Sequence, residues 1–445
     1  MSAQDAQSYW ISRRIPTDQF LLYCFAATPH PLAVIGEQLR VRACAVADLR
    51  IRVREVPGGM DLPHWVPMDP AAAPIRLHAG PMSWGGCREA VAALLTDRLD
   101  ATQSPWRLHL FGPVAGAPEC GSGDAVVAVL QVAHALGDGR RASAIARDLF
   151  APVPPAPPAA AAPWRPAQAV AAAAVRLPIQ VGQMLVRARP AYLGHQRLVR
   201  DTAAGVIPAA PPSLPKLLTN AAPDGRRAIA TVVVDADTLR GAGSTVTVGA
   251  MTAISMALTR YLRGRGADPA ACLAAEVTVA KPGRPVSRNH FRNVAVDLHP
   301  RIEDPAERAA AIAESLRRRR LRADHPSGAA EDRVLAAVPA PLLRHGVEHF
   351  DFTAVPDEVT GNTVVSSVDR GPDDLTLGGG RVRFTAGFPA LSQFMGLTHG
   401  VHGMGGRVTI SVVTSPAVLP DLDGYVDLLR YAVRRLGAGR DRDTP

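Results

Sequence analysis

Residues 151–166 read APVPPAPPAAAAPWRP, and this density of proline divides the chain into two parts. Proline has a fixed φ angle and no amide hydrogen, so neither a helix nor a strand ladder continues through such a segment. Segments of this composition are typical of extended linkers. We therefore predict an N-terminal lobe over residues 1–150, a linker with a crossover helix over 151–225, and a C-terminal lobe over 226–445.

Each lobe is predicted to mix strands and helices. The valine-rich run at 125–132, AVVAVLQV, predicts a buried strand. Asp304, Pro305 and Glu307 form a strong helix start. Both lobes therefore belong to the α/β (α+β) class, with two mixed layers packed side by side. The expected helices cover 86–99, 140–150, 249–262, 305–322 and 421–436, and the other expected strands cover 229–234, 273–279, 363–367, 382–385 and 407–413.

The segment between the lobes predicts a helix over 170–198, interrupted at Pro178 and Pro190, with apolar residues on one side and arginines on the other. Such a helix either rests on a membrane surface or packs across the lobe junction. We predict no membrane span, because polar residues and a proline break 167–186, and a bilayer needs about 20 mainly apolar residues. Residues 1–15 contain no apolar core of signal-peptide length. We expect a cytoplasmic protein, with peripheral contact at a membrane or lipid inclusion left open.

The formal net charge of +9 does not indicate nucleic-acid binding. The only lysines are Lys216 and Lys281, and the arginines are spread along the whole chain, which is typical of GC-rich coding. Aromatic residues, on which single strands stack, make up only 5%. The five cysteines, at 24, 44, 87, 120 and 272, are widely spaced and predict reduced thiols. We expect no metal site, and the His399/His402 pair has no third ligand nearby in the sequence.

The strongest candidate site follows the strand at 125–132. His134, Asp138 and Gly139 stand where the strand leaves the sheet. A histidine there reaches a cleft on a fixed backbone, and its ordinary pKa of about 6.5 suits it to accept a proton from a hydroxyl. The alternative is structural: His134 is satisfied by a carbonyl, and Asp138 caps the next helix.

The HxxxDG motif formed by these residues, between a strand and a helix, resembles that of CoA-dependent acyltransferases with the chloramphenicol acetyltransferase-like fold. More closely, the chain resembles the bacterial wax ester synthase/diacylglycerol acyltransferase family over nearly its whole length. The matching segments are Ser2–Ala6 (S-P-x-D-A in the family), Leu99–Asp100 with Ser104–Trp106 (L-D…P-L-W), Asn220–Arg227 (N…G-R-R), Arg292–Asn293 (G-N), Asn362–Ser367 (S-N-V), Gly378–Val382 (A-G-x-R-V) and the closing helix.

The chain departs from the family pattern at several positions. The first of the family's two adjacent histidines is Ala133, and a paired N-D is replaced by Thr247–Val248. Pro105 stands at the leucine of P-L-W, and Ser367 at the asparagine of S-N. The family's following P-G-P is Asp369-Arg-Gly371 here.

The resemblance implies two chloramphenicol acetyltransferase-like lobes with a reaction tunnel between them. It implies an acyl-CoA-dependent O-acyltransferase that esterifies a long-chain alcohol or diacylglycerol, as in wax ester or triacylglycerol synthesis. His134 is then the general base, Asp138 and Gly139 shape its loop, and Asn293, Ser367 and Trp106 are substrate-binding positions. Acyl-CoA is a co-substrate, and no cofactor or metal is implied.

Several points stay open from the sequence. The oxyanion donor is Asn293, Ser367 or a backbone amide near Gly139. Asp138 either binds an arginine, with Arg284 as a candidate, or is a solvated loop residue, and the abundance of arginines favours the solvated residue. The run 317–320 either closes a helix or holds CoA phosphates or lipid head groups. Two alternative functions are an acyltransferase for another acceptor (polyketide, sugar or amine) and a non-catalytic acyl-CoA- or lipid-binding protein.

Overall fold

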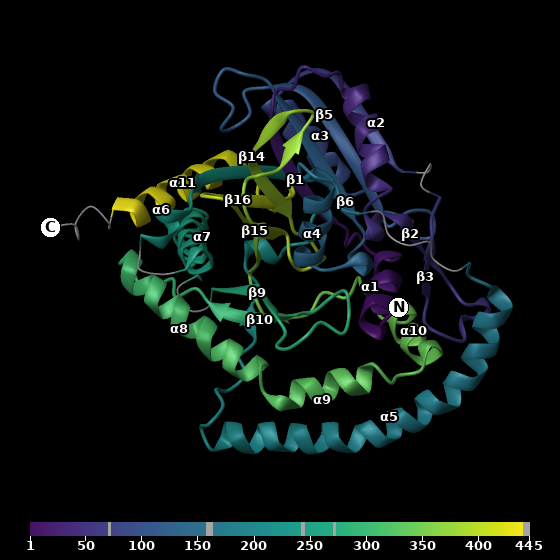
Figure 1. Ribbon diagram of the computed structural model, residues 1–445. Coiled ribbons are helices and arrows are strands. Elements are labelled where there is room, and N and C mark those ends of the chain that lie inside the picture. Colours follow the sequence, from purple (N-terminus) through teal and green to yellow (C-terminus); the bar gives the residue numbers. More distant parts are fainter. Residues whose placement is uncertain (70–72, 157–162, 242–244, 270–272, 439–445) are drawn as a thin grey trace.

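The computed structural model describes residues 1–69, 73–156, 163–241, 245–269 and 273–438. Its framework is a pair of six-stranded sheets that lie side by side, each with helices packed on it (Figure 1). The predicted mixed α/β class is confirmed. Residues 157–162 of the predicted linker, and Cys272, lie outside the described residues.

The first sheet has the strand order β13-β14-β1-β6-β5-β4. Helices α2 and α4 pack on one face of this sheet, and α3 packs on the other. β6 is buried along its whole length and has the predicted bounds, because valine-rich strands suit a sheet covered on both faces. The elements are β1 Gln19–Ala26, β4 Ile75–Ser83, β5 Trp106–Ala115, β6 Ala125–Val132, β13 Thr376–Leu377, β14 Gly380–Phe388, α2 Leu32–Ala43, α3 Trp84–Leu94 and α4 Gly139–Phe150.

Two strands of this first sheet come from the C-terminal part of the chain. β14 pairs antiparallel with β1, with Phe20 opposite Phe388 and Tyr23 opposite Thr385. The predicted division into lobes 1–150 and 226–445 is therefore wrong for residues 376–388. The physical reason is that β1 would otherwise be an exposed sheet edge, and β14 covers it.

The second sheet has the order β10-β9-β12-β15-β16-β8. Helices α6, α7, α8 and α11 cover it and share one core with its strands. The bounds are β8 Ala228–Asp235, β9 Ala274–Ala280, β10 Phe291–Asp297, β12 Thr363–Asp369, β15 Leu397–Met404, β16 Arg407–Thr414, α6 Ala236–Arg240, α7 Val246–Arg263, α8 Pro305–Ala323 and α11 Leu422–Ala438. Asp304 caps α8 as predicted, accepting from the amides of Ala306 and Glu307 at 2.9 Å.

Helix α5, Pro166–Ala203, contains Pro178 and Pro190 without a break. The predicted interruptions at these prolines are therefore wrong. The helix is largely exposed, so carbonyls that lose an amide partner at each proline face water, and the helix curves along the molecule beside α9, Pro326–Leu335 (Figure 1). By length and composition alone α5 qualifies as a membrane span, which differs from the expectation above; among the described residues no other helix does.

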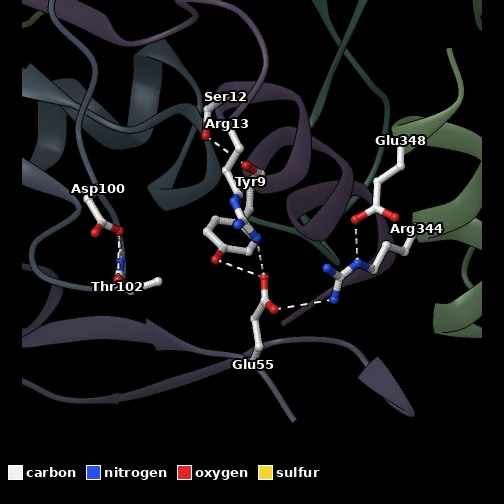
Figure 2. A network of polar contacts seen from close by, with 8 residues as sticks. All are labelled: Tyr9, Ser12, Arg13, Glu55, Asp100, Thr102, Arg344 and Glu348. Carbon is white, nitrogen blue, oxygen red and sulfur yellow. Dashed lines mark hydrogen bonds and ion pairs between the residues drawn. The ribbon is translucent and has the colours of Figure 1, made fainter. Parts of the chain in front are cut away.

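The N-terminal helix α1, Ala3–Ser12, is tied to both parts of the chain through Glu55. This carboxylate accepts from the Tyr9 hydroxyl at 3.0 Å, from Arg13 at 2.8 Å and from Arg344 of α10 at 3.3 Å (Figure 2). Arg344 also pairs with Glu348 at 2.7 Å. α1 is thereby fixed where it contacts the loop that follows β6. The remaining elements are β2 Ile51–Arg54 paired with β3 His64–Pro67, β7 Leu214–Pro215 paired with β11 Glu358–Val359, α10 Ala340–Glu348, and short 3-10 turns at Ala47–Arg50, Pro57–Gly59, His134–Leu136 and Leu218–Asn220.

Candidate active site

A cavity of about 890 Å³ lies between the two sheets, and the predicted motif lines it. Its walls come from the start of β1, the loop after β6, the first turn of α7, β9 and β10, the end of β12, and the ends of β14 and β15. His134, Asp138, Gly139, Asn293 and Ser367 all line this one cavity. The fold thus brings together residues that are up to 233 positions apart in the sequence.

His134 opens the 3-10 turn that follows β6. The amide of Ala133 donates to Pro105 O at 2.8 Å, so the sheet holds the backbone up to the histidine. The ring packs against Phe291 with 5.6 Å between the ring centroids. Nδ1 is buried without a hydrogen-bond partner among the described residues. The nitrogen that is left to meet a substrate is therefore Nε2.

Burial lowers the pKa of His134 below its ordinary value of 6.5. The backbone carbonyl of His134 itself, the Asn289 side chain and the charges of Asp138 and Asp5 act in the opposite direction but do not outweigh the loss of water. The imidazole is therefore neutral at neutral pH, which is the form that accepts a proton.

A loop from the C-terminal lobe, residues 281–290, holds the histidine turn in place. Asn289 Nδ2 donates to His134 O at 2.8 Å, and Arg288 Nη1 donates to Leu136 O at 3.2 Å. The amide of Asp138 donates to Arg288 O at 3.1 Å. These bonds join the two lobes directly at the candidate base.

Asp5 of α1 organises this loop in turn. It is 2% exposed, and its carboxylate accepts from the amide of Arg288 at 3.1 Å, the amide of Asn289 at 3.0 Å and Asn289 Nδ2 at 2.9 Å. A buried carboxylate with this many donors is a rigid anchor. Asp5 and Asn289 therefore act on the reaction through His134, as positioning residues.

Asp138 has no arginine partner among the described residues, so the ion pair for which Arg284 was a candidate is absent. The carboxylate caps α4 by accepting from the amide of Arg141 at 3.1 Å, and it also accepts from the amide of His290 at 3.1 Å. Arg141 and Arg288 pair with Asp48 instead. The structural alternative for Asp138, a helix cap, is confirmed. The bond from the amide of His290 also joins Asp138 to the loop 281–290, in addition to the bond from the amide of Asp138 to Arg288 O.

Gly139 permits a close approach between the lobes. A Cβ at this position would lie 3.1 Å from Val368 Cγ2 of β12. Gly139 is not among the glycines with a positive φ angle, so its backbone does not require glycine. What favours glycine here is the short distance between its Cα and the Val368 side chain.

Ser367 and Thr247, two positions where the chain departs from the family pattern, meet in the cavity. Their hydroxyl oxygens lie 2.8 Å apart, and Thr247 is in the first turn of α7. Asn293 is on the edge strand β10, where Thr278 Oγ1 donates to its Oδ1 at 3.3 Å. Asn293 also lines a second cavity of about 370 Å³.

Trp106 does not line the cavity. It is fully buried in the core of the first sheet, and its Nε1 donates to Leu49 O at 3.0 Å. Its position in the core is structural, and it does not reach the cavity that the other predicted site residues line. Of the run 317–320, Arg320 lines the cavity, while Arg317 pairs with Glu314 and Arg319 donates to Ala295 O.

Sequence reasoning missed Asn289, His290, Arg370 and His402 as site residues. Asn289 and His290 belong to no motif, Arg370 stands in the sequence only as a departure from the family's P-G-P, and His402 only as half of the His399/His402 pair. The fold brings all four to the site. For Asp5 the sequence contains one indication of a role, because Asp5 lies in the segment Ser2–Ala6 that resembles the family's S-P-x-D-A.

Comparison with known proteins finds one matching family model and several solved structures with a similar fold. Residues 288–436 match the family model for the WS/DGAT C-terminal domain. The wax ester synthase/diacylglycerol acyltransferase from Marinobacter aquaeolei VT8 superimposes with a TM-score of 0.63 at 18% identity, covering 98% of each chain.

Condensation domains of peptide synthetases have the same fold. The first condensation domain of the CDA synthetase gives a TM-score of 0.57 at 16% identity, covering 99% of this chain and 96% of the other. The starter condensation domain of rhizomide synthetase RzmA, in complex with C8-CoA and Leu-SNAC, gives 0.54 at 13% identity, covering 99% and 94%. These likenesses establish the two-lobed chloramphenicol acetyltransferase-like fold. Residues 288–436 of the chain therefore carry a WS/DGAT C-terminal domain, within a fold that the chain shares with a wax ester synthase/diacylglycerol acyltransferase and with condensation domains.

Proposed function

We propose that this protein transfers an acyl group from acyl-CoA to the hydroxyl of a long-chain alcohol or diacylglycerol, with His134 as the general base. The observation that carries the proposal is the placement of His134. Its Nδ1 is buried, its lowered pKa keeps the ring neutral, and the ring lines the cavity between the lobes. Acyl-CoA enters as a co-substrate, and the reaction needs no cofactor.

The proposed reaction has two proton transfers. Nε2 of His134 accepts the hydroxyl proton while the oxygen attacks the thioester carbonyl carbon. The tetrahedral intermediate then collapses, the C–S bond breaks, and the thiolate takes the proton from His134. The products are an ester and free CoA thiol, and the histidine is neutral again.

Stabilisation of the oxyanion is assigned to the hydroxyl pair of Thr247 and Ser367. Hydrogen-bond donors aimed at the developing charge usually accelerate acyl transfer more than any other single interaction in the site. One hydroxyl of the pair donates to the other, so one proton is left to point at the oxyanion. The amides of the first turn of α7 add positive potential on the same side.

The cavity mouth suits the phosphates of CoA. Arg140, Arg240 and Arg320 line the cavity and are exposed. A solvent-exposed arginine at the edge of a cavity binds phosphate in a bidentate manner without a large desolvation cost.

We propose a cytoplasmic location with peripheral contact to a membrane or lipid inclusion, made by α5. Val175, Leu185 and Val186 of this helix are 64%, 66% and 73% exposed, and Arg189 is exposed beside them. Exposed apolar residues next to arginines favour the surface of an anionic lipid layer.

The acceptor is tested by product identification. Purified protein is incubated with palmitoyl-CoA and, in turn, hexadecanol, diacylglycerol, a sugar and an amine, and the products are identified by mass spectrometry. Ester from hexadecanol or diacylglycerol supports the proposal. Product from the sugar or amine alone replaces it with the alternative acyltransferase, and binding of acyl-CoA without any product replaces it with the non-catalytic alternative.

A further inference from the structure

Arg370 is a buried charge in the cavity wall without a carboxylate partner. Its side chain follows β12, is 3% exposed and lines the same cavity as His134. Nη1 donates to Ala386 O at 3.0 Å and to Thr385 Oγ1, and the guanidinium carbon lies 5.2 Å from the centroid of the Tyr23 ring. Nε has no acceptor, and no carboxylate pairs with this arginine among the described residues. Because arginine keeps its proton in proteins, the buried charge is only partly compensated.

His402 lies beside this charge. It is 5% exposed, it lines the cavity from β15, and its Nδ1 has no partner among the described residues. Burial and the positive charge of Arg370 push the pKa of His402 well below its ordinary value of 6.5. A neutral imidazole next to a guanidinium adds a hydrogen-bond donor without adding a second charge.

Gly387 leaves room for both groups. A Cβ at this position would lie 2.6 Å from His402 Nε2 and 2.7 Å from Arg370 Nη2. The two nitrogens therefore converge on one region at the end of β14, which also lines the cavity. Any residue with a side chain at 387 would displace them.

This pair lines the same cavity as His134. Val368, two residues before Arg370, approaches the backbone of Gly139, and Arg147 of α4 donates to Arg370 O at 3.2 Å. Arg370 also occupies the central position of the segment 369–371, where the family pattern has the glycine of P-G-P. The arginine is therefore a feature of this chain and not of the family pattern.

The burial of Arg370 indicates that it binds a carboxylate and not the phosphates of CoA. The CoA phosphates are large and strongly hydrated, and the exposed arginines at the mouth suit them. A single carboxylate is small enough to enter a buried subsite, and its two oxygens match the donors of one guanidinium and one imidazole. The three cavity-lining carboxylates, Asp18, Asp138 and Asp369, already accept backbone amides, and none pairs with Arg370.

We propose that Arg370 and His402 form a carboxylate-binding subsite, so that the substrate class of this enzyme includes an acid and not only neutral lipids. This deepens the acyl transfer proposed above and rests on it for the identity of the reaction. The carboxylate belongs either to the acceptor, which is then a hydroxy acid, or to the acyl group, which is then a dicarboxylic monothioester.

The test measures binding, and so it does not depend on turnover. Titration calorimetry on the full-length protein compares an ω-hydroxy fatty acid with its methyl ester. We expect the wild type to bind the acid about tenfold or more tightly than the ester. Arg370→Gln abolishes this preference but leaves the Kd of the ester unchanged, and the unchanged Kd shows that the variant is folded. Equal Kd values for acid and ester in the wild type, or a preference that survives Arg370→Gln, overturn the proposal.

A second variant covers the case in which Arg370→Gln does not fold. Gly387→Ala places a methyl group against both nitrogens while keeping the charge, and it is expected to remove the same preference. Two kinetic arms then locate the carboxylate. A faster release of thiol from palmitoyl-CoA with the hydroxy acid than with hexadecanol places it on the acceptor, and a faster release from an ω-carboxyacyl-CoA with hexadecanol places it on the acyl group. Absence of turnover in both arms contradicts the proposed acyl transfer. The carboxylate subsite is tested separately, by the Kd values of the acid and the ester, which do not depend on turnover.

Discussion

Asn289 Nδ2 donates to the backbone carbonyl of His134 at 2.8 Å, and so the orientation of the candidate base in one lobe depends on a side chain from the other. The same Nδ2 donates to Asp5 Oδ1 at 2.9 Å. Helix α1, the loop 281–290 and the histidine turn are therefore one hydrogen-bonded unit. This arrangement makes the distance between the lobes part of the catalytic geometry.

Asn289→Ala is expected to lower kcat by about 10- to 100-fold with little change in the KM for acyl-CoA, because the histidine turn loses its anchor while the cavity mouth is unchanged. Steady-state kinetics checks this. The matched control is Asn220→Ala, another buried asparagine, whose amide donates to Gly361 O and Phe394 O away from the cavity. Equal losses of kcat in both variants would mean that Asn289 contributes only to folding.

The pH dependence follows from the lowered pKa of His134. A base must be neutral, so kcat/KM falls on the acid side as the ring becomes protonated. Because the pKa lies below 6.5, we expect the half-maximal point of the acid limb below pH 6.5 and a plateau at neutral pH. A limb centred well above pH 7 would contradict the assignment of His134 as the base.

Ser367→Ala and Thr247→Val are each expected to lower kcat roughly 10- to 100-fold, since each removes one hydroxyl of the pair assigned to the oxyanion. The double variant should be only slightly worse than either single variant, because the two hydroxyls act as one hydrogen-bonded unit. A double-mutant cycle on kcat/KM measures this coupling. Additive losses would indicate that the two side chains have separate roles.

Asp18 offers a prediction on stability. Burial raises the pKa of its carboxyl from 3.8 to about 6. The folded state therefore binds the proton more tightly than the unfolded chain, and this group lowers stability as the pH rises from about 4 to about 6. Asp18 Oδ2 accepts from both the Leu99 amide and Gln131 Nε2, and an asparagine oxygen can keep both bonds. Asp18→Asn should raise the free energy of unfolding at pH 7 by about 1–3 kcal/mol.

Urea unfolding of Asp18→Asn and the wild type at pH 4.5 and pH 7 provides the measurement. The gain should be present at pH 7 and small at pH 4.5, where the wild-type carboxyl is largely protonated. A variant that is less stable than the wild type at pH 7 would show that the carboxylate is held by more than these two donors.

Helix α5 gives a prediction on lipid contact. The double variant Leu185→Asp/Val186→Asp should reduce co-sedimentation with anionic vesicles by about tenfold, because it replaces two exposed apolar side chains with charges that anionic lipid repels. Val153→Asp, at a 78% exposed valine outside α5, is the control. Equal binding by the wild type and the α5 variant would show that this helix does not contact lipid.

The parts of the fold that could be predicted are those set by local patterns. The apolar run of β6 gave both ends of the strand, and Asp304 gave the start of α8, because burial and capping depend on neighbouring residues. The motif residues His134, Asp138 and Gly139 were placed correctly at the end of a strand, and all three line the cavity.

The parts that could not be predicted depend on contacts between distant residues. Nothing local assigns β14 to the first sheet, since its partner β1 lies about 360 residues earlier in the chain. The partners of Asp138 are backbone amides, which leave no trace in the sequence, so neither the arginine nor the solvated loop position considered for Asp138 identifies them. Asn289 belongs to no motif, and Arg370 stands in the sequence only as a departure from the family's P-G-P. The roles of both follow only from the packing of one lobe on the other.

The role of His134 is tested most directly by acceptor-dependent release of thiol from palmitoyl-CoA by the wild type, His134→Ala and His30→Ala, the last being an exposed histidine outside the cavity. We expect hexadecanol or diacylglycerol to stimulate release by the wild type and by His30→Ala, and we expect His134→Ala to lose at least about 100-fold of this activity. Acceptor-dependent release that persists in His134→Ala would contradict the assignment of His134 as the catalytic base.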